Sequence, residues 1–291
     1  MRPFTNPAGI LGRGGIGASG LGISMESYLN TAIEIAREAG GLLLEQFRQP
    51  LEITYKTRSD LVTEADRKSE TLIVARLRSF FPDHAIVAEE GGGQKTGSDY
   101  CWYVDPLDGT TNFAHGFPIF GVTLGLSWRN EVVAGVVYDP TRGELFAVER
   151  GAGAFLNGLR LCVSSHSRLA ECLVGTGFPP FASNHDLNVQ FYFRFTQLTH
   201  GIRRAGSAAL DLCSVAAGRF DGFWELKLNP WDKAAGTLLV TEAGGQVSGI
   251  TGRPFNLLGD DIFASNGLVH DQMLAVFREV LHERGCADFG S

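Results

Sequence analysis

The stretch FGVTLGLSW, residues 120–128, alternates strictly between large apolar side chains and small or polar ones. Successive side chains of a strand point to opposite faces, so this pattern predicts a β-strand with one strongly apolar face. The segments VVAGVVYDP and ELFAVER follow after short gaps, and Asn130 and Gly143 supply turn residues between the three. The middle of the chain is therefore predicted to form a meander of antiparallel strands.

Helical and strand signals alternate on both sides of this meander. Apolar residues at helical spacing predict a first helix from about Glu26 to Phe47, which ends before Pro50, and a second from about Thr63 to Phe81. Further helices are predicted at 185–199, 207–220, 231–243 and 268–283. Further strands are predicted at 85–90, 100–106, 171–176, 221–226, 245–250 and 261–265. Because no linker divides residues 25–291, we expect one α+β domain of mixed, largely antiparallel sheets with layered helices.

Residues 1–24 differ from the rest of the chain. The segment PAGILGRGGIGASGLG is rich in glycine and has no period, which predicts a flexible N-terminal tail. It contains a match to G-x-G-x-x-G at residues 12–17, but a dinucleotide fingerprint follows a strand and opens a helix. We therefore interpret the match as meaningless. Met25 directly precedes the first helix and is an alternative start of translation.

The composition restricts the classes of partner. The formal charge of −7 opposes general binding to nucleic acids or membranes, because both surfaces are negative. An acidic protein that handles anionic small molecules needs a local positive charge, most simply a bound metal ion. Five cysteines without CxxC spacing favour a reducing compartment. Since there is no apolar run of about 20 residues and no continuous apolar signal region, the expected location is the cytoplasm.

Carboxylates gather at four places in the sequence: Asp66, Glu89 with Glu90, Asp105 with Asp108, and Asp232. Glu89 and Asp105 stand where apolar strands end, which is where open sheets build their sites. Like charges at such a place repel one another unless a cation neutralises them. An all-oxygen set suits a hard ion such as Mg²⁺. Each place also has a structural reading: a capped loop for Asp105 to Gly109, a solvated turn for Glu89 and Glu90, and a helix N-cap for Asp232.

The order of residues in DPLDGTTNF (105–113) refines this hypothesis. Pro106 excludes an ordinary helix through the motif, so we expect a turn that aims both carboxylates and the Leu107 carbonyl inward. Gly109 permits a backbone conformation that other residues resist. Thr110 is then expected to begin a short helix, whose first N–H groups are free to bind an anion.

Long motifs in this chain resemble the inositol monophosphatase family of Mg²⁺-dependent sugar and polyol phosphatases. They are SDLVTEAD, VAEE, DPLDGTTNFAHGFPIFGVTLGL, GAGAFLNG, HGIRRAGSAALDLCSVAAGRFDGFWE and WDKAAGTLLVTEAGG. They occur in the family's order over about residues 25–280. The resemblance implies a layered αβαβα sandwich, commonly a homodimer.

The resemblance also implies roles for individual residues. Glu89, Asp105 and the Leu107 carbonyl would hold a first Mg²⁺, and Asp105, Asp108 and Asp232 a second. The implied catalytic groups are Asp66 and Thr110, which would orient a metal-bound water, and Glu90, which would support the metal ligands. Implied substrate contacts include the N–H groups of Gly109 and Thr110 for the phosphate. The remaining ones face the substrate alcohol: Gly206, Ser207, Ala208, Glu225 and Asp232.

The predicted function is Mg²⁺-dependent hydrolysis of inositol monophosphate by direct attack of a metal-activated water. Relatives of the same fold hydrolyse fructose 1,6-bisphosphate, histidinol phosphate, adenosine bisphosphates or NADP, and these substrates stay open. Two other classes stay open as well: a regulatory or RNA-associated scaffold, and a cation-binding protein without turnover. The intact set of acids and the acidic charge favour the enzyme.

Overall fold

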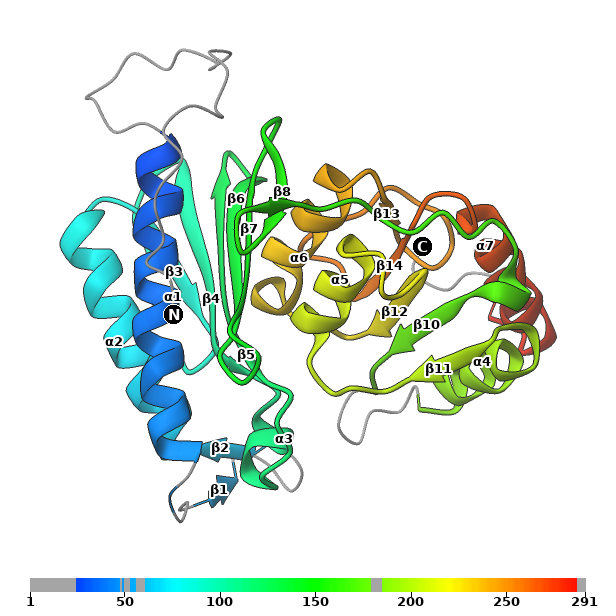
Figure 1. Cartoon of the computed structure of the whole chain (residues 1–291), viewed down its shortest axis with the longest axis horizontal. Helices are drawn as coiled ribbons and strands as arrows, with labels where there is room; N and C mark the ends of the chain where they lie inside the picture. Colours follow the sequence, from blue (N-terminus) through cyan, green and yellow to red (C-terminus); the bar gives the residue numbers. More distant parts are fainter. Residues whose placement is uncertain (1–24, 48, 50–52, 56–60, 179–184, 287–291) are drawn as a thin grey trace.

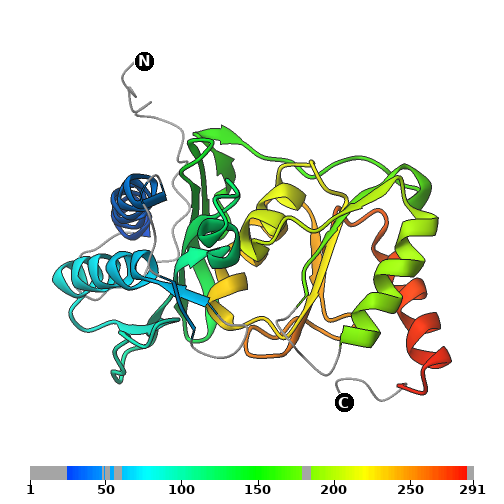
Figure 2. The same cartoon turned by 90° about the horizontal axis from the view of Figure 1, so that it is seen from below.

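The computed structural model describes residues 25–47, 49, 53–55, 61–178 and 185–286. The tail predicted at residues 1–24 lies outside them. Five layers follow one another in the order helices, sheet, helices, sheet, helices (Figure 1 and, from below, Figure 2). The predicted α+β class and layered sandwich are confirmed.

The first two layers contain the meander. Helices α1 (Met25–Phe47) and α2 (Glu64–Phe80) cover one face of a seven-stranded sheet. Its strands follow one another in sequence order: β3 (Ala85–Ala88), β4 (Tyr100–Asp108), β5 (Gly121–Trp128), β6 (Glu131–Asp139), β7 (Glu144–Glu149), β8 (Gly153–Leu156) and β9 (Leu159–Arg160). Strands β3 and β4 are parallel, and every later pair is antiparallel. The predicted meander is confirmed, while the short strands β8 and β9 were not predicted.

Both faces of this sheet are buried. In β5, the large side chains face α1 and the small ones face α6. The large side chains Val122, Leu124 and Leu126 pack into the core shared with α1. On the other face, a Cβ at Gly125 would lie 2.7 Å from the Cβ of Ala234 in α6. The small residues of β5 therefore let α6 (Pro230–Glu242) approach the sheet backbone closely.

The second sheet has five strands in the order β11-β10-β12-β14-β13, with both parallel and antiparallel pairs. Their bounds are β10 (Leu173–Thr176), β11 (Gly201–Arg203), β12 (Gly222–Leu226), β13 (Gln246–Ser248) and β14 (Asp261–Ser265). Helices α5 (Ala208–Ala216) and α6 separate the two sheets, and α4 (His185–Leu198) and α7 (His270–Glu283) cover the outer face. The remaining elements are β1 (Ile53–Tyr55), β2 (Leu61–Thr63), α3 (Thr110–Ala114) and the 3₁₀ turn η1 (Leu169–Glu171).

Several boundaries differ from the sequence-based expectation. Strand β4 continues through Pro106 to Asp108, where a turn was predicted. Helix α5 ends at Ala216 although the prediction reached 220, and β11 was missed because it is only three residues long. Short strands carry little periodic signal in the sequence. Whether such a segment forms a strand depends on its pairing with a neighbouring strand.

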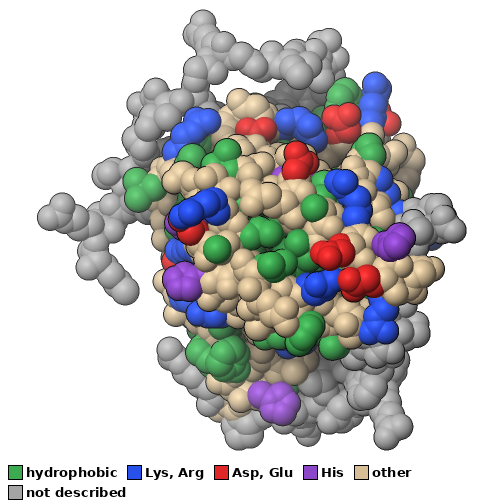
Figure 3. All heavy atoms as spheres, turned by 90° about the vertical axis from the view of Figure 1, so that its right-hand side faces the viewer, with side chains coloured by type: hydrophobic (Ala, Val, Ile, Leu, Met, Phe, Trp, Pro, Cys, Tyr) green, Lys and Arg blue, Asp and Glu red, His purple; other side chains and the backbone are tan. Residues whose placement is uncertain are grey.

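The aromatic run QFYFRF in α4 divides between core and surface. Phe191 and Phe195 are buried and pack edge-on against Phe277 of α7. Tyr192 and Phe193 are exposed. Figure 3 shows the end of the molecule formed by α4 and α7, where hydrophobic side chains lie among charged ones. None of the helices described is long and apolar enough to cross a membrane.

Candidate active site

Strand β4 delivers two carboxylates through a bulge. Asp105 pairs with Thr123 and Asp108 pairs with Gly121, so three steps along β4 match two steps along β5. One extra residue in a strand is a β-bulge, which bends the strand and redirects its side chains. The Leu107 N–H donates to Asp105 Oδ1 at 3.0 Å, which fixes this bend. Asp105 and Asp108 are both buried at the end of the strand.

The chain reverses directly after Asp108. Gly109 has φ +97°, and a Cβ there would lie 2.9 Å from the carbonyl oxygen of Ile119. Only glycine adopts this conformation without strain in so little space. Thr110 then begins α3, as predicted. Its hydroxyl lies 2.9 Å from Asp66 Oδ1 and 3.0 Å from the Leu107 carbonyl oxygen, so it can donate to either.

Glu89 and Glu90 follow β3, which lies parallel to β4. The Glu89 N–H donates to the carbonyl of Val104, which places Glu89 beside Asp105. The carboxylate of Glu70 holds this turn from α2, because it accepts from the N–H groups of Glu90 and Gly92 at 2.7 Å each. Glu70 lies four residues after Asp66 on the same helix. That spacing was the sequence signal that could have revealed it.

Asp108 is tied to the start of α5. Its Oδ2 accepts from the Ser207 hydroxyl at 2.6 Å and from the Ala209 N–H at 2.8 Å. Ser207 is the N-cap of α5. These bonds join residues about 100 positions apart and bring the segment from Gly206 to Ala208 against the bulge.

Asp232 is not the N-cap of α6, which was the structural interpretation of the sequence. Asn229 is the N-cap of α6, and Asp232 stands at its N3 position, where Oδ2 accepts from the Asn229 N–H at 2.7 Å. Pro230 at the first helical position explains the shift, because proline is favoured there. Asp232 therefore closes a capping box while it faces the other carboxylates.

Glu225 is the last but one residue of the buried strand β12, and its carboxylate lies against Gly177, which follows β10. A Cβ at Gly177 would overlap the Glu225 carboxylate, so only glycine fits above it. Asn188 of α4 links Gly177 to Trp224, the residue before Glu225. Its Nδ2 donates to the Gly177 carbonyl, and its Oδ1 accepts from Trp224 Nε1, each at 2.7 Å. Burial and the nearby Asp108 raise the pKa of Glu225 to about 8, against the opposing effect of Arg204.

The carboxylates act on one another electrostatically. Burial, together with Glu89, Asp108 and Asp232, raises the pKa of Asp105 well above its usual value. The pKa of Asp108 rises to about 6 through burial, although Ser207 and Ala209 oppose the rise. Burial, Asp108 and Glu89 raise the pKa of Asp232 well above its usual value. Four acids from β4, α6 and the end of β3 therefore converge on one place.

The donor chemistry of this cluster fits a hard cation, since every group is an oxygen and the burial of like charges is costly without one. However, no three His, Cys, Asp or Glu side chains in the described ranges form a group that could hold a metal ion as they stand. Oxygens of Asp105, Asp108 and Asp232 are instead occupied by backbone N–H groups.

Comparison with known proteins identifies the family of this chain. The model of the inositol monophosphatase family matches residues 24–283. A Nus factor SuhB of Pseudomonas aeruginosa is 48% identical over 251 residues, which cover 83% of this chain and 92% of that one. An inositol-1-monophosphatase of Mesorhizobium japonicum is 41% identical and covers 90% of this chain and 100% of that protein.

The crystal structure of an extragenic suppressor protein suhB from Bartonella henselae has a TM-score of 0.84 at 39% identity, covering 87% of this chain and 99% of that one. Both the sequence and the layered fold are thus shared along nearly the whole chain. The chain belongs to the inositol monophosphatase family.

Proposed function

We propose that this protein is a Mg²⁺-dependent phosphomonoesterase that hydrolyses inositol monophosphate to inositol and phosphate. One observation carries the proposal: the hydrogen bond between Thr110 and Asp66 lies beside the buried cluster of Asp105 and Asp108. Membership of the family supports a phosphatase. The identity of the ester comes from the resemblance.

The metal sites are part of the proposal. Glu89, Asp105 and the Leu107 carbonyl would hold one Mg²⁺, and Asp105, Asp108 and Asp232 a second. Support comes from their oxygen donors and from their burial, which raises the pKa of all three aspartates; neighbouring acids add to the rise for Asp105 and Asp232. When bound, the metal would neutralise charge on the phosphate ester and lower the pKa of water.

Groups of the protein itself would bind the phosphate and orient the attacking water. The N–H groups of Gly109 and Thr110 at the start of α3 would bind the phosphate oxygens. The Thr110 hydroxyl and the Asp66 carboxylate would orient the attacking water and accept its proton. Glu90 would support this arrangement through the turn that Glu70 holds.

The alcohol side of the substrate would face Gly206, Ser207 and Ala208, with Glu225 accepting from its hydroxyl groups. Asp232 would lie near the departing oxygen. The close approach of Gly177 to the Glu225 carboxylate supports a fixed position for this carboxylate. We further propose a cytoplasmic homodimer, with the dimer implied by the resemblance and the compartment supported by five free cysteines.

A panel assay tests the function. Phosphate release by the full chain would be measured with inositol monophosphate, fructose 1,6-bisphosphate, histidinol phosphate, an adenosine bisphosphate and NADP, with and without Mg²⁺. We expect Mg²⁺-dependent turnover with the highest kcat/KM for inositol monophosphate, and loss of turnover in a folded Asp105→Asn variant. Full turnover by that variant would refute the metal assignment. A higher kcat/KM for another ester would contradict inositol monophosphate as the preferred substrate.

A second candidate function rests on the relative that is 48% identical and named a Nus factor. We propose that a role in transcription accompanies turnover. Growth of a deletion strain complemented with the wild type or with Asp105→Asn separates the two roles. Rescue by the inactive variant supports the second role, and failure of a folded, inactive variant contradicts it.

A further inference from the structure

A buried hydroxyl group without a partner lies on β5, next to the carboxylates of the candidate active site. It belongs to Thr123, which is completely shielded from solvent. Its Oγ1 atom has no hydrogen-bond partner among the residues that the structure describes. Buried polar groups are nearly always hydrogen-bonded, because a buried donor that has lost its water and gained no partner is unfavourable. The Thr123 hydroxyl therefore needs an explanation.

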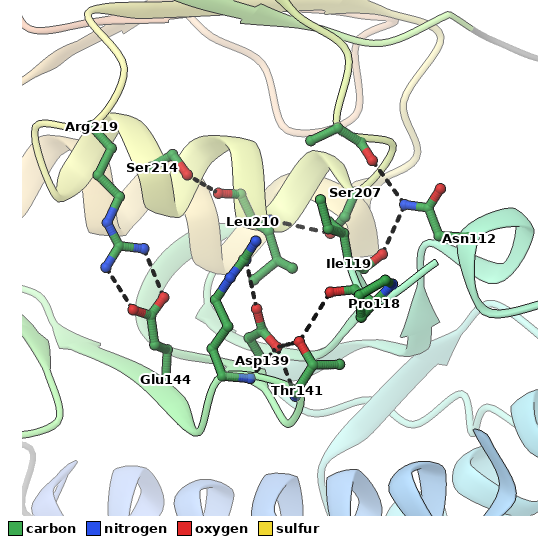
Figure 4. Close-up of polar contacts among 12 residues, drawn as sticks. Asn112, Pro118, Ile119, Asp139, Thr141, Glu144, Ser207, Leu210, Ser214 and Arg219 are labelled. Carbon is green, nitrogen blue, oxygen red and sulfur yellow. Dashed lines mark hydrogen bonds and ion pairs between the residues drawn. The ribbon is translucent and has the colours of Figure 1, made fainter. Parts of the chain in front are cut away.

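The surroundings of Thr123 on its face of the sheet are apolar on three sides. Its pairing partner on β6 is Val137, which belongs to the core that the sheet shares with α5 and α6. Along β5, the nearest residues on the same face are Gly121 and Gly125. Leu210 of α5 (Figure 4) covers Gly121, because its side chain lies 3.6 Å from the place where a Cβ would stand. None of these neighbours offers the hydroxyl a side-chain acceptor.

The neighbour on the fourth side is Asp105. It pairs directly with Thr123 across β4 and β5, and Cβ atoms in such pairs are about 4.5–5.5 Å apart on the same face. Asp105 is buried as well, and its Oδ1 accepts from the Leu107 N–H at 3.0 Å. A carboxylate can accept roughly four hydrogen bonds. Asp105 can therefore also accept one from Thr123, once the threonine side chain rotates about its Cα–Cβ bond.

We propose that Thr123 is a positioning residue for Asp105, whose carboxylate it holds by a hydrogen bond when the proposed metal sites are occupied. The inference rests on the proposed function, in which both Mg²⁺ sites share Asp105 and therefore depend on its orientation. Carboxylates that bind metal ions are themselves hydrogen-bonded, and loss of such a partner lowers metal affinity or activity about 10–100-fold. The close approach of α6 explains a small side chain at position 123. It does not explain the hydroxyl, because valine has nearly the same shape.

A binding experiment tests the proposal without any turnover. Mg²⁺ would be titrated calorimetrically into the full chain and into Thr123→Val, which removes the hydroxyl and keeps the shape. We expect the Kd for Mg²⁺ to rise about tenfold or more in Thr123→Val, and to stay within about threefold in Thr123→Ser, which keeps the hydroxyl. Thr237→Val is the matched control and should leave the Kd unchanged. Thr237 is buried in α6, and its hydroxyl donates to the Ala234 carbonyl at 3.0 Å.

The stability of the metal-free protein separates a positioning role from a structural one. The Thr123 hydroxyl has no partner in the described residues, so Thr123→Val should leave the urea midpoint of the metal-free chain unchanged or raise it. Thr237→Val should lower the midpoint, because that substitution removes a hydrogen bond that the structure contains. A lower midpoint for Thr123→Val with an unchanged Kd for Mg²⁺ would show a purely structural role and overturn the proposal.

The same titrations distinguish failure of this inference from failure of the proposed function. Equal Kd values for the wild type and Thr123→Val overturn the role of Thr123 and leave the metal sites supported. Absence of Mg²⁺ binding by the wild type contradicts both. With inositol monophosphate as substrate, the Mg²⁺ concentration for half-maximal turnover should rise about tenfold in Thr123→Val and return towards the wild-type value in Thr123→Ser. A loss of turnover at an unchanged Mg²⁺ requirement would contradict a role through Asp105.

Discussion

The hydroxyl of Thr110 lies 2.9 Å from Oδ1 of Asp66, although the two residues are 44 positions apart. Asp66 is fully buried in the first turn of α2, and Thr110 is the first residue of α3. The same hydroxyl lies 3.0 Å from the Leu107 carbonyl oxygen, so both oxygens are within its hydrogen-bond distance. In the proposed mechanism, that geometry orients the attacking water.

Replacing Thr110 by valine removes the hydroxyl and keeps the shape of the side chain. We expect kcat to fall at least about 10²-fold, which is the lower end of the range for loss of a general acid or base. Thr111→Val is the matched control, because Thr111 is exposed in the same helix and its replacement should leave kcat within about twofold. Circular dichroism would show that both variants are folded. Equal activity of the two variants would contradict the role of Thr110.

Divalent cations are expected to stabilise the protein through the carboxylate cluster. Ligand that binds only the folded state adds about 2.7 kcal/mol to the free energy of unfolding at a concentration of 100 Kd. Mg²⁺ should therefore raise the Tm of the wild type and leave that of Asp105→Asn unchanged. Glu131→Gln, at an exposed carboxylate in β6, should respond as the wild type does. A Tm of Asp105→Asn that rises equally with Mg²⁺ would contradict the metal site.

Gly177→Ala tests the placement of Glu225. The added Cβ would overlap the carboxylate, so Glu225 or the segment after β10 must move. We expect KM for inositol monophosphate to rise about tenfold or more, while kinetics with p-nitrophenyl phosphate, which has no vicinal hydroxyl groups, change little. Gly97→Ala is the control, since a Cβ there meets nothing within 4 Å. An equal change in KM for both esters would show that Glu225 does not select the alcohol.

Adjacent glycines in α1 should respond in opposite directions to alanine. A Cβ at Gly40 would lie 2.5 Å from Cδ1 of Tyr138, so Gly40→Ala should lower the free energy of unfolding by about 1–3 kcal/mol. A Cβ at Gly41 meets nothing within 4 Å, so Gly41→Ala should raise it by about 0.4–1 kcal/mol. Urea denaturation measures both values. A destabilised Gly41→Ala would contradict the packing of α1 on β6.

His270 should make stability depend on pH far from the active site. Its ring is buried between the hydroxyls of Ser248 and Ser265, and burial lowers its pKa from 6.5 to about 4. The unfolded chain binds a proton below about pH 6.5 and the folded chain only below about pH 4. Stability from this group is therefore complete above pH 6.5 and decreases as the pH falls towards 4, by up to about 3 kcal/mol.

Unfolding free energies between pH 7 and pH 4 would be compared for the wild type and His270→Gln. Glutamine keeps hydrogen-bonding groups but has no proton to bind, so the variant should lose less stability on acidification. Parallel curves for the two proteins would contradict the lowered pKa. His282→Gln, at the far end of the same helix, is the control.

Local patterns in the sequence were enough for the helices and the longer strands and for the candidate carboxylates, but not for short strands such as β8, β9 and β11. The helix predicted at 231–243 is observed at Pro230–Glu242, and the strand predicted at 261–265 is observed there. Periodicity records which face of an element is buried, so it can be read without knowing the neighbours. The carboxylates at strand ends were found in the same way, because their residue type and position already restrict their chemistry.

Tertiary structure alone decided how these elements meet. The bulge at Asp105–Asp108 exists because β4 stays paired with β5 past Pro106, and the bond between Ser207 and Asp108 crosses 99 positions of the chain. Arg203 and Arg204 line one pocket with Arg142 and Arg219 because β11, α5 and the turn before β7 pack together. Such contacts depend on the order of strands and the packing of helices, which are properties of the whole chain. No single segment encodes them, and this is why the sequence determined the parts and the fold determined their arrangement.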